Sequence, residues 1–264
     1  MNKPHFADQT GFPPDTVYLA WQIGGNPKYR HETIIPKGCI EIIFNFSPDK
    51  ITFRPAGSTE QSMPPCFISG INTIPFVLDH SSHHALFGLR LHPCAVQNLL
   101  AVPSGEFIDK TVDLTLIDPV FRALWHRLYP AGFEQRIRLV DQWIRDTYHA
   151  PRGLDKAIGG FLEAPIRDCT VAHLSEQLCS SRRNLTRKFR QLLGMCTEEA
   201  LLYRKYLRSL ELVHHTDRAL TEIAYESNFY DQSHFIREFR RYAELTPTEY
   251  RKSRSPLCGH IYLG

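Results

Sequence analysis

Two short segments near the end of the chain are rich in side chains that can make paired hydrogen bonds. The first places Ser181, Arg182, Arg183, Asn184, Arg187, Lys188 and Gln191 within eleven residues, and the second places Gln232, Ser233, His234, Arg237 and Arg241 within ten. Arg and Gln suit bidentate contacts to guanine and adenine edges, while Ser, Lys and backbone N–H groups suit phosphates. The chemistry expected of both segments is recognition of a nucleic acid.

Helical spacing positions the first set within a unit that runs from Val171 to Leu193. Thr170 can cap a first helix, a turn follows at Cys179-Ser180, and Ser181 can cap a second helix. The apolar residues of that second helix recur on one side, so the basic and amide side chains collect on the other. This layout predicts a helix-turn-helix whose second helix enters the major groove of DNA.

A second unit with the same layout runs from Leu220 to Tyr242, with Asp231 as the cap of its second helix. One basic helix face alone is typical of a solvated surface, whereas two copies favour DNA binding. The sequence predicts a helix from Thr197 to His215 between the units. Such a helix would hold them so that both recognition helices meet successive major grooves about 34 Å apart.

The stretch from Ile223 to Arg251 resembles the signature of AraC/XylS-type transcription regulators. The residues that carry this resemblance are Phe229-Tyr230-Asp231-Gln232-Ser233-His234-Phe235, Phe239-Arg240-Arg241 and Thr246-Pro247. It covers roughly residues 165 to 253 and implies that the first unit supplies most base contacts. The chain departs from the family pattern at Thr197, Lys205, Asn228 and Glu244, where the family usually has Pro, Arg, Gly and Gly. We expect Asn228 to keep the turn, because Asn tolerates positive φ.

The N-terminal part alternates short apolar runs with Gly, Pro and Asn, which predicts strands at Val17–Ile23, Ile40–Phe46, Cys66–Ile71 and Ala85–Leu91. Residues 35–45 and 87–93 resemble the cupin-like sensor half of one branch of these regulators, which implies a jelly-roll-type barrel. Helical spacing follows at Cys94–Ala101, Pro119–Tyr129 and Phe133–Tyr148. The predicted fold is α+β: a cupin-like domain with flanking helices over residues 1–150, and an all-α DNA-binding domain over residues 151–264.

Four N-terminal residues are candidates for effector binding: Glu41, His84, Arg90 and His92. Strand periodicity places the last three on one face. A pocket there would hold a metal through His84 and His92 or an anionic effector through Arg90 and His92. The alternative is that these side chains lie on a solvent-facing edge or hold a loop. Glu41 lies among apolar residues, so we expect it on an exposed face or paired with Arg54 or Arg90.

Composition narrows the class of protein. The 31 Lys+Arg and 28 Asp+Glu leave a net charge of +3, with 16 basic against 12 acidic residues in the segment 166–254. No run of about 18 apolar residues and no secretion signal is present, so we expect a soluble cytoplasmic protein that does not interact with membranes. Seven scattered cysteines without a Cys-x-x-Cys pair predict mostly buried free thiols.

These observations predict a DNA-binding transcription regulator, activator or repressor, that responds to an effector. No nucleophile motif, phosphate loop or zinc-protease helix is present, so no enzymatic activity, metal or cofactor is predicted. The expected partners are double-stranded DNA, a small-molecule effector and a second copy of the chain, with RNA polymerase added for an activator. The alternative is a cupin-like metal-binding protein or enzyme whose helices bind nucleic acid nonspecifically.

Overall fold

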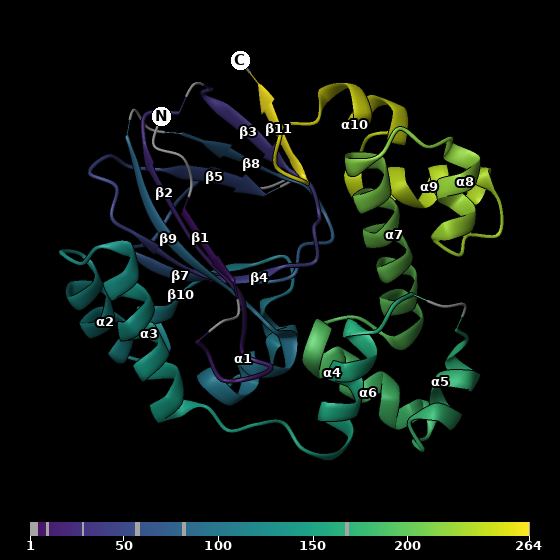
Figure 1. Cartoon of the computed structure of the whole chain (residues 1–264), viewed down its shortest axis with the longest axis horizontal. Coiled ribbons are helices and arrows are strands. Elements are labelled where there is room, and N and C mark those ends of the chain that lie inside the picture. The colour runs from purple at the N-terminus through teal and green to yellow at the C-terminus, as the bar shows by residue number, and fades with distance from the viewer. Residues whose placement is uncertain are drawn as a thin grey trace.

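Strands fill the first third of the chain and helices most of the rest, as Figure 1 shows for the computed structural model. The structure describes residues 5–8, 11–27, 29–55, 59–80, 83–166 and 169–263. The predicted α+β class is confirmed, with a β-rich N-terminal part and a helical C-terminal part that contains two helix-turn-helix units.

Two antiparallel sheets face each other in the N-terminal part. The six-stranded sheet has the order β1 (His5–Asp8), β2 (Val17–Gly25), β9 (His84–Leu91), β4 (Ile40–Asn45), β7 (Cys66–Ser69) and β10 (Thr111–Asp113). The five-stranded sheet has the order β11 (His260–Leu263), β3 (His31–Ile34), β8 (Phe76–Asp79), β5 (Thr52–Pro55) and β6 (Gln61–Ser62). The four predicted strands are confirmed as β2, β4, β7 and β9.

Side-chain alternation along β4 explains how the layers form, because successive residues of a strand point to opposite faces. Ile42 and Phe44 are fully buried in the main apolar core, on the side covered by helices. Ile43 points the other way and lines a cavity between the two sheets. The five-stranded sheet holds a separate small cluster around Ile34 and Phe53. The cavity lies between this small cluster and the six-stranded sheet.

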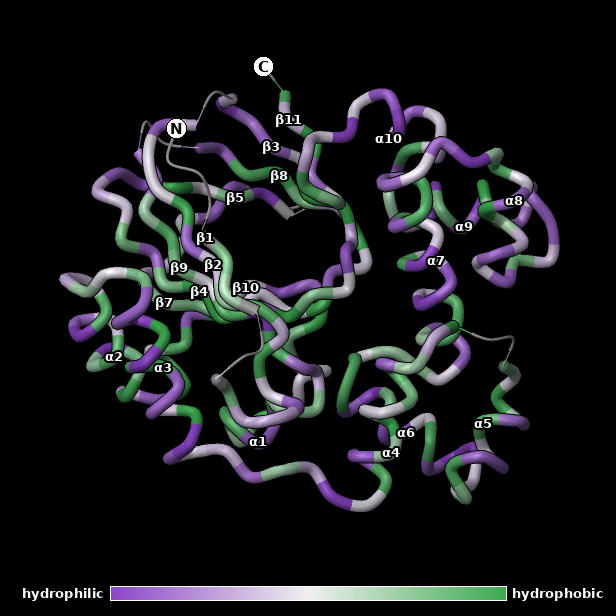
Figure 2. The backbone as a smooth tube through the Cα atoms, in the orientation of Figure 1, coloured by the Kyte–Doolittle hydropathy of each residue, from purple (hydrophilic) through white to green (hydrophobic). Residues whose placement is uncertain are grey.

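Helices α1 (Pro93–Leu100), α2 (Val120–Leu128) and α3 (Phe133–Thr147) pack around the six-stranded sheet, and two short 3-10 helices, η1 (Ser104–Phe107) and η2 (Leu114–Leu116), lie between them in the chain. They confirm the helices predicted after Pro93. Hydrophobic residues run along the strands of this sheet and alternate with hydrophilic ones along the helices (Figure 2). This periodicity is what packs one side of each helix onto the sheet.

The C-terminal part contains α4 (Gly153–Glu163), α5 (Val171–Gln177), α6 (Arg182–Leu193), α7 (Thr197–His215), α8 (Leu220–Glu226), α9 (Gln232–Ala243) and α10 (Pro247–Ser253). Helix α7 has the predicted bounds and packs against α6, α8, α9 and α10. It therefore connects the two units as expected. None of the helices in the described ranges is long and apolar enough to cross a membrane.

Two features of the fold differ from the sequence-based expectations. The chain does not end within the helical part, because β11 returns to pair with β3 of the five-stranded sheet (Figure 1). The thiols are not mostly buried either. Cys66 and Cys94 are buried, Cys179 is exposed and the other four are half-buried, since most of the cysteines lie on turns and helix ends outside the core.

Candidate nucleic-acid interface

The first unit is built by local hydrogen bonds at its turn. The Thr170 hydroxyl accepts from the amide of His173 (3.2 Å) at the start of α5, and the Ser181 hydroxyl accepts from the amide of Asn184 (3.3 Å) at the start of α6. Cys179 adopts φ +46° between them. Leu185 and Phe189 are fully buried, so the opposite side of α6 faces away from the core.

The second unit repeats this backbone geometry. Leu178 and Ser227, which end α5 and α8, both have φ −93° and ψ 7°. Asn228 has φ +59°, which confirms that Asn can replace the turn Gly. The Asp231 carboxylate accepts from the amide of His234 (2.7 Å) and caps α9. The repeat predicted from the sequence is therefore also a repeat of conformation.

The outward face of α6 presents a connected set of polar side chains. Arg182, Arg183 and Arg187 are exposed. The Arg187 guanidinium donates to the side-chain oxygens of Asn184 (2.8 Å) and Gln191 (3.3 Å). These bonds hold three of the predicted contact residues together on one side of the helix, where they could meet base edges.

Lys188, which the sequence analysis placed among the contact residues, is directed elsewhere. Its ammonium group lies 2.7 Å and 3.0 Å from the two carboxylate oxygens of Asp155 on α4, and the side chain is half-buried. A lysine at this helical position flanks the face, so tertiary packing decides its direction. Lys188 therefore joins α6 to α4 and does not extend from the outward face as predicted.

The outward face of α9 is built differently. Ser233, Arg237 and Arg241 are exposed, and Gln232 is half-exposed in the first turn. Arg237 and Arg241 flank the buried carboxylate of Glu238 at 3.2 Å and 3.5 Å. This acidic neighbour offsets part of the positive charge, so the face of α9 attracts phosphates less strongly than that of α6.

His234 points toward its own domain. Its ring meets the ring of Phe229 edge-on, with 5.4 Å between centroids, and the residue is half-buried. The sequence predicted His234 as a contact residue beside Ser233, but the first turn of α9 packs against the preceding turn. The His234 ring therefore packs against that turn and does not extend from the surface.

Three further residues extend these surfaces beyond the predicted contact set. Arg190 and Arg240 are exposed on the same faces, where helical periodicity places them. Tyr230 is 93% exposed and directly precedes the cap Asp231. Its position at the turn was the only signal in the sequence. An exposed aromatic ring beside a recognition helix can pack on sugar or base groups.

The N-terminal part reaches the edge of the first recognition face. The Ser104 hydroxyl of η1 donates to the carbonyl of Leu192 (2.5 Å), and a Cβ atom at Gly105 would lie only 1.9 Å from the carbonyl oxygen of Arg190. Glu106 borders a hollow that Arg183 and Arg187 also line. The end of α6 is thus docked on the β-rich part, with a carboxylate beside the arginines.

The effector candidate Glu41 is buried and fully partnered. Its carboxylate accepts from the indole of Trp21 (3.0 Å) and pairs with Lys37 (3.6 Å) and Arg90 (3.5 Å). Burial raises the pKa of Glu41, but the two cations and the indole outweigh it and hold the pKa below its usual value. Of the two predicted partners, Arg90 is confirmed, while Arg54 pairs with other acidic residues.

The structure does not bring the four effector candidates together. His84 is buried beside His80 at one end of β9, with 2.8 Å between ring nitrogens, whereas His92 caps α1 at the other end and faces Glu163 (3.2 Å). Eight residues of strand separate them by about 26 Å, so they cannot share a metal ion. Both are buried, which also excludes the solvent-facing alternative.

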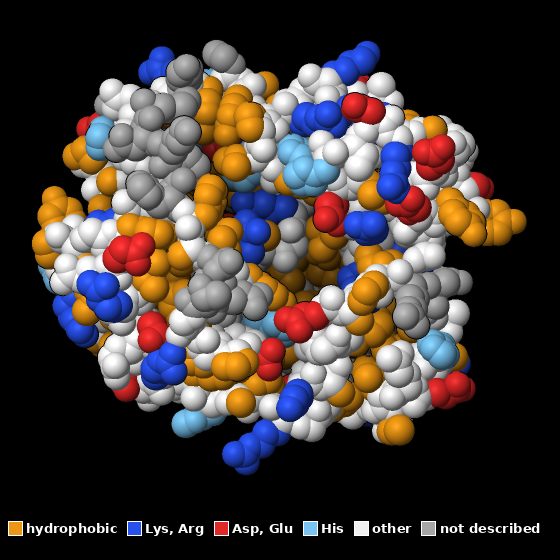
Figure 3. All heavy atoms as spheres, in the orientation of Figure 1, with side chains coloured by type: hydrophobic (Ala, Val, Ile, Leu, Met, Phe, Trp, Pro, Cys, Tyr) orange, Lys and Arg blue, Asp and Glu red, His pale blue; other side chains and the backbone are white. Residues whose placement is uncertain are grey.

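Effector candidates line two hollows of the β-rich part. Glu41 and His84 line the cavity between the sheets, and Arg90 lines a groove between the β-rich and helical parts, together with Glu41. Figure 3 shows the groove as a hollowed region near the centre of the view, with Lys and Arg side chains inside it. His92 lines neither of these hollows.

The two parts of the chain match two different family models. A family model described as a helix-turn-helix domain matches residues 174–253, and one described as a domain of unknown function (DUF6597) matches residues 15–113. An uncharacterized HTH-type transcriptional regulator of Haemophilus influenzae is 30% identical over 117 residues, which is 44% of this chain and 39% of that protein. The HTH-type transcriptional activator RhaS of Salmonella arizonae is 32% identical over 84 residues, 32% of this chain and 30% of that protein.

The chain thus spans well under half the length of these curated relatives. Among solved structures, unsaturated fatty acid-bound ToxT from Vibrio cholerae aligns over 96% of this chain and 99% of ToxT, with a TM-score of 0.51 and 12% sequence identity. That likeness shows a shared fold, in which a β-rich part and a pair of helix-turn-helix units occur in one chain.

Proposed function

Since residues 174–253 form an AraC-type helix-turn-helix domain, we propose that this protein is a transcription regulator that binds DNA sequence-specifically. Each of its two recognition helices, α6 and α9, reads a major-groove segment. The two segments are adjacent on one face of the DNA, about one helical turn apart.

The repeated cap hydrogen bond of the two units is the observation that supports this proposal most strongly. The side chains of Ser181 and Asp231 each accept from the amide three residues later, at the start of a recognition helix, and α7 joins the units as one continuous helix. A recognition helix can present one face to a groove only if its first residue and its packing are fixed. Both are fixed in each of the two units, with Arg, Asn and Gln on the outward sides.

The first unit carries most of the sequence reading. Its face joins Arg187, Asn184 and Gln191 by hydrogen bonds, and no acidic residue lies on α6 itself. The face of α9 includes Glu238 between two arginines. The second unit therefore contributes mainly grip on the neighbouring groove, through Gln232, Ser233 and Arg237.

The β-rich part acts as the sensor. The cavity between its sheets binds a small-molecule effector, with Glu41 and His84 in its wall. An effector can change DNA affinity only if it binds better to one arrangement of the two parts than to another. The docking of α6 on η1 is a contact through which such a difference would act. The regulator pairs with a second copy of the chain on DNA, and it contacts RNA polymerase if it activates transcription.

Selection of bound fragments from a random duplex pool tests this function. The full-length protein should enrich a sequence with two short conserved blocks whose centres lie about 10 to 10.5 base pairs apart. The double variant Arg183→Ala/Arg187→Ala should lose that enrichment. Retention of duplexes without any enriched sequence would instead support the nonspecific alternative.

A further inference from the structure

The last residues of the chain link the helical part back to the β-rich part. After α10 the chain runs through residues 255–263, here called the C-terminal strap, and ends in β11. Strand β11 pairs antiparallel with β3, from His260 opposite Ile34 to Leu263 opposite His31. The second helix-turn-helix unit is thereby attached to the wall of the effector cavity, far along the sequence from the segment that joins the two parts.

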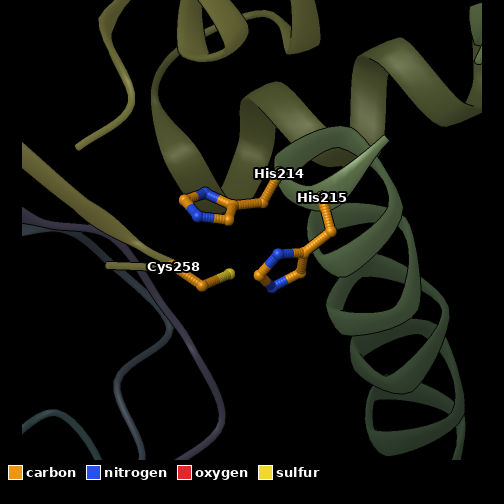
Figure 4. Close-up of side chains that lie close together, drawn as sticks. All are labelled: His214, His215 and Cys258. Carbon is orange, nitrogen blue, oxygen red and sulfur yellow. The ribbon is translucent and has the colours of Figure 1, made fainter. Parts of the chain in front are cut away.

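The start of the strap is fastened to the helical part. The Tyr250 hydroxyl accepts from the amide of Gly259 (2.9 Å) and donates to Nδ1 of His214 (2.7 Å), and Arg254 donates to the carbonyl of Val213 (2.5 Å). Figure 4 shows His214 and His215, at the end of α7, next to Cys258 of the strap. Because the Tyr250 hydroxyl occupies Nδ1 of His214, we interpret His214, His215 and Cys258 as a structural contact that holds the strap against α7.

The end of the strap is fastened to the β-rich part. Nδ1 of His260 donates to Glu32 (2.6 Å), and Nε2 accepts from Lys37 (3.0 Å). Burial, followed by the charge of Lys37, lowers the pKa of His260, so its ring is neutral and fits this arrangement of donor and acceptor. The rings of Tyr262 and Tyr29 stack, with 3.7 Å between centroids.

The strap is also a wall of the cavity. His260 and Leu257 line both the cavity between the sheets and the groove between the two parts, so the strap stands between them. The cavity measures about 120 Å³, a size that suits a single aromatic ring. Its other walls are mostly apolar, including Ile34, Phe53 and Phe67.

The charges around the cavity favour a cation. Among the described residues that line it, Glu32 and Glu41 are carboxylates and Lys37 is the one ammonium group. Lys37 and Arg90 already neutralise Glu41. Glu32 is held by imidazoles, His80 at 2.8 Å and His260 at 2.6 Å, and the latter belongs to the strap. A buried cation needs such a carboxylate to offset its lost hydration.

We propose that the cavity takes a small, flat, largely apolar molecule with a cationic N–H-donating head, which pairs with Glu32 in place of His260 and displaces the C-terminal strap. The proposal rests on the sensor role proposed above and names both the ligand class and the moving segment. Displacement frees the second helix-turn-helix unit from the β-rich part. The ligand thereby favours a different placement of α6 and α9.

Benzamidine and benzoate form a matched pair of probes, since both carry a planar head on a phenyl ring but with opposite charge. Titrations are made by calorimetry on the full chain without DNA, so their outcome does not depend on whether the protein binds DNA. Benzamidine should bind and benzoate should not. Glu32→Gln should weaken benzamidine binding at least about tenfold, because the buried cation loses its counter-charge.

Two variants separate strap displacement from simple binding. His260→Ala removes the competitor for Glu32 and should tighten benzamidine binding several-fold. Tyr262→Ala loosens the strap away from the cavity and should act in the same direction. Leu263→Ala, at a side chain that is 48% exposed, is the control and should leave binding unchanged. Thermal unfolding of each variant verifies that the chain is folded.

Hydrogen exchange of the β3 amides reports the strap directly. Exchange at Thr33 and Ile35 should accelerate when benzamidine is bound, because their amides face the strap: Thr33 lies opposite Ile261, and the amide of Ile35 donates to the carbonyl of Gly259 (2.9 Å). Benzoate binding equal to that of benzamidine, or no binding of benzamidine at millimolar concentration, would overturn the ligand class. Benzamidine binding with unchanged β3 exchange, or unchanged affinity in both strap variants, would overturn the displacement.

Discussion

The guanidinium group of Arg187 lies 2.8 Å from the side-chain oxygen of Asn184, one turn earlier on the same helix face. The bond holds the arginine extended along the face before DNA arrives, so less side-chain entropy is lost on binding. Arg187→Ala should therefore weaken the binding free energy for the selected site by about 1–3 kcal/mol and relax the preference at one base pair. Fluorescence anisotropy on single-base variants of the site measures both effects.

Arg208→Ala is the matched control for this prediction. Arg208 is half-exposed on α7 and pairs with Glu211 (3.0 Å). The variant therefore removes the same charge as Arg187→Ala, but away from both recognition faces. Its effect should be small and equal for all duplexes. A loss of affinity as large as that of Arg187→Ala would show that net charge, and not base reading, explains the result.

The two recognition helices should contribute unequally. Arg183→Ala/Arg187→Ala should abolish discrimination between the selected site and random DNA, whereas Gln232→Ala/Arg237→Ala should weaken binding and leave most discrimination. The physical reason is Glu238, which pairs with Arg237 and offsets its charge. Competition with unlabelled random duplex measures discrimination. Equal loss in both double variants would contradict the asymmetry.

The caps of the recognition helices should be measurable in stability. Asp231→Ala removes the carboxylate that accepts from the amide of His234, and should lower the free energy of unfolding by about 0.5–2 kcal/mol. Asp231→Asn keeps a cap and should cost much less. Urea unfolding followed by circular dichroism compares the two, and an equal loss would mean that charge, rather than capping, is what stabilises α9.

Glu244 ends α9 with φ +57°, the left-handed conformation, where the first unit has Gly194 at φ +77°. A side chain in this conformation costs roughly 1 kcal/mol, so Glu244→Gly should raise the free energy of unfolding by up to that amount. Gly194→Ala should lower it, because the added Cβ would also lie 2.7 Å from Cβ of Ile108. A destabilised Glu244→Gly would show that the carboxylate makes a favourable contact.

Acid should destabilise the protein in a defined range. Burial, followed by the charge of His80, lowers the pKa of His84 from 6.5 to about 4. Between these values the unfolded chain binds more protons than the folded chain, so stability falls as pH falls, by at most about 1.4 kcal/mol per pH unit for one residue. Urea midpoints measured between about pH 7 and about pH 5 should show this slope. His84→Asn should reduce it, and an unchanged slope would exclude His84 as a cause.

Local signals made the helical part predictable. Thr170, Ser181 and Asp231 are caps that are recognised within four residues of chain, and Asn228 supplies the positive φ that its turn needs. Each depends on neighbours along the sequence. The direction of Lys188 was not predictable in this way, because Asp155 lies 33 residues earlier.

The β-rich part was predictable only in outline. The strong strands β2, β4, β7 and β9 have clear apolar runs, but the pairing of β11 with β3 joins residues more than 200 positions apart. Strand periodicity correctly grouped His84 with Arg90 on one face of β9. The strand is so long, however, that His84 lines the cavity and Arg90 lines the groove. Such positions follow from tertiary packing and not from spacing.

Sequencing the duplexes that the full chain retains from a random pool directly tests whether the two helix-turn-helix units read DNA sequence. We expect one enriched sequence with two conserved blocks about 10 to 10.5 base pairs apart, of which the block bound by α6 carries more information. Retained duplexes with no common sequence, at any salt concentration, would contradict sequence reading by these units.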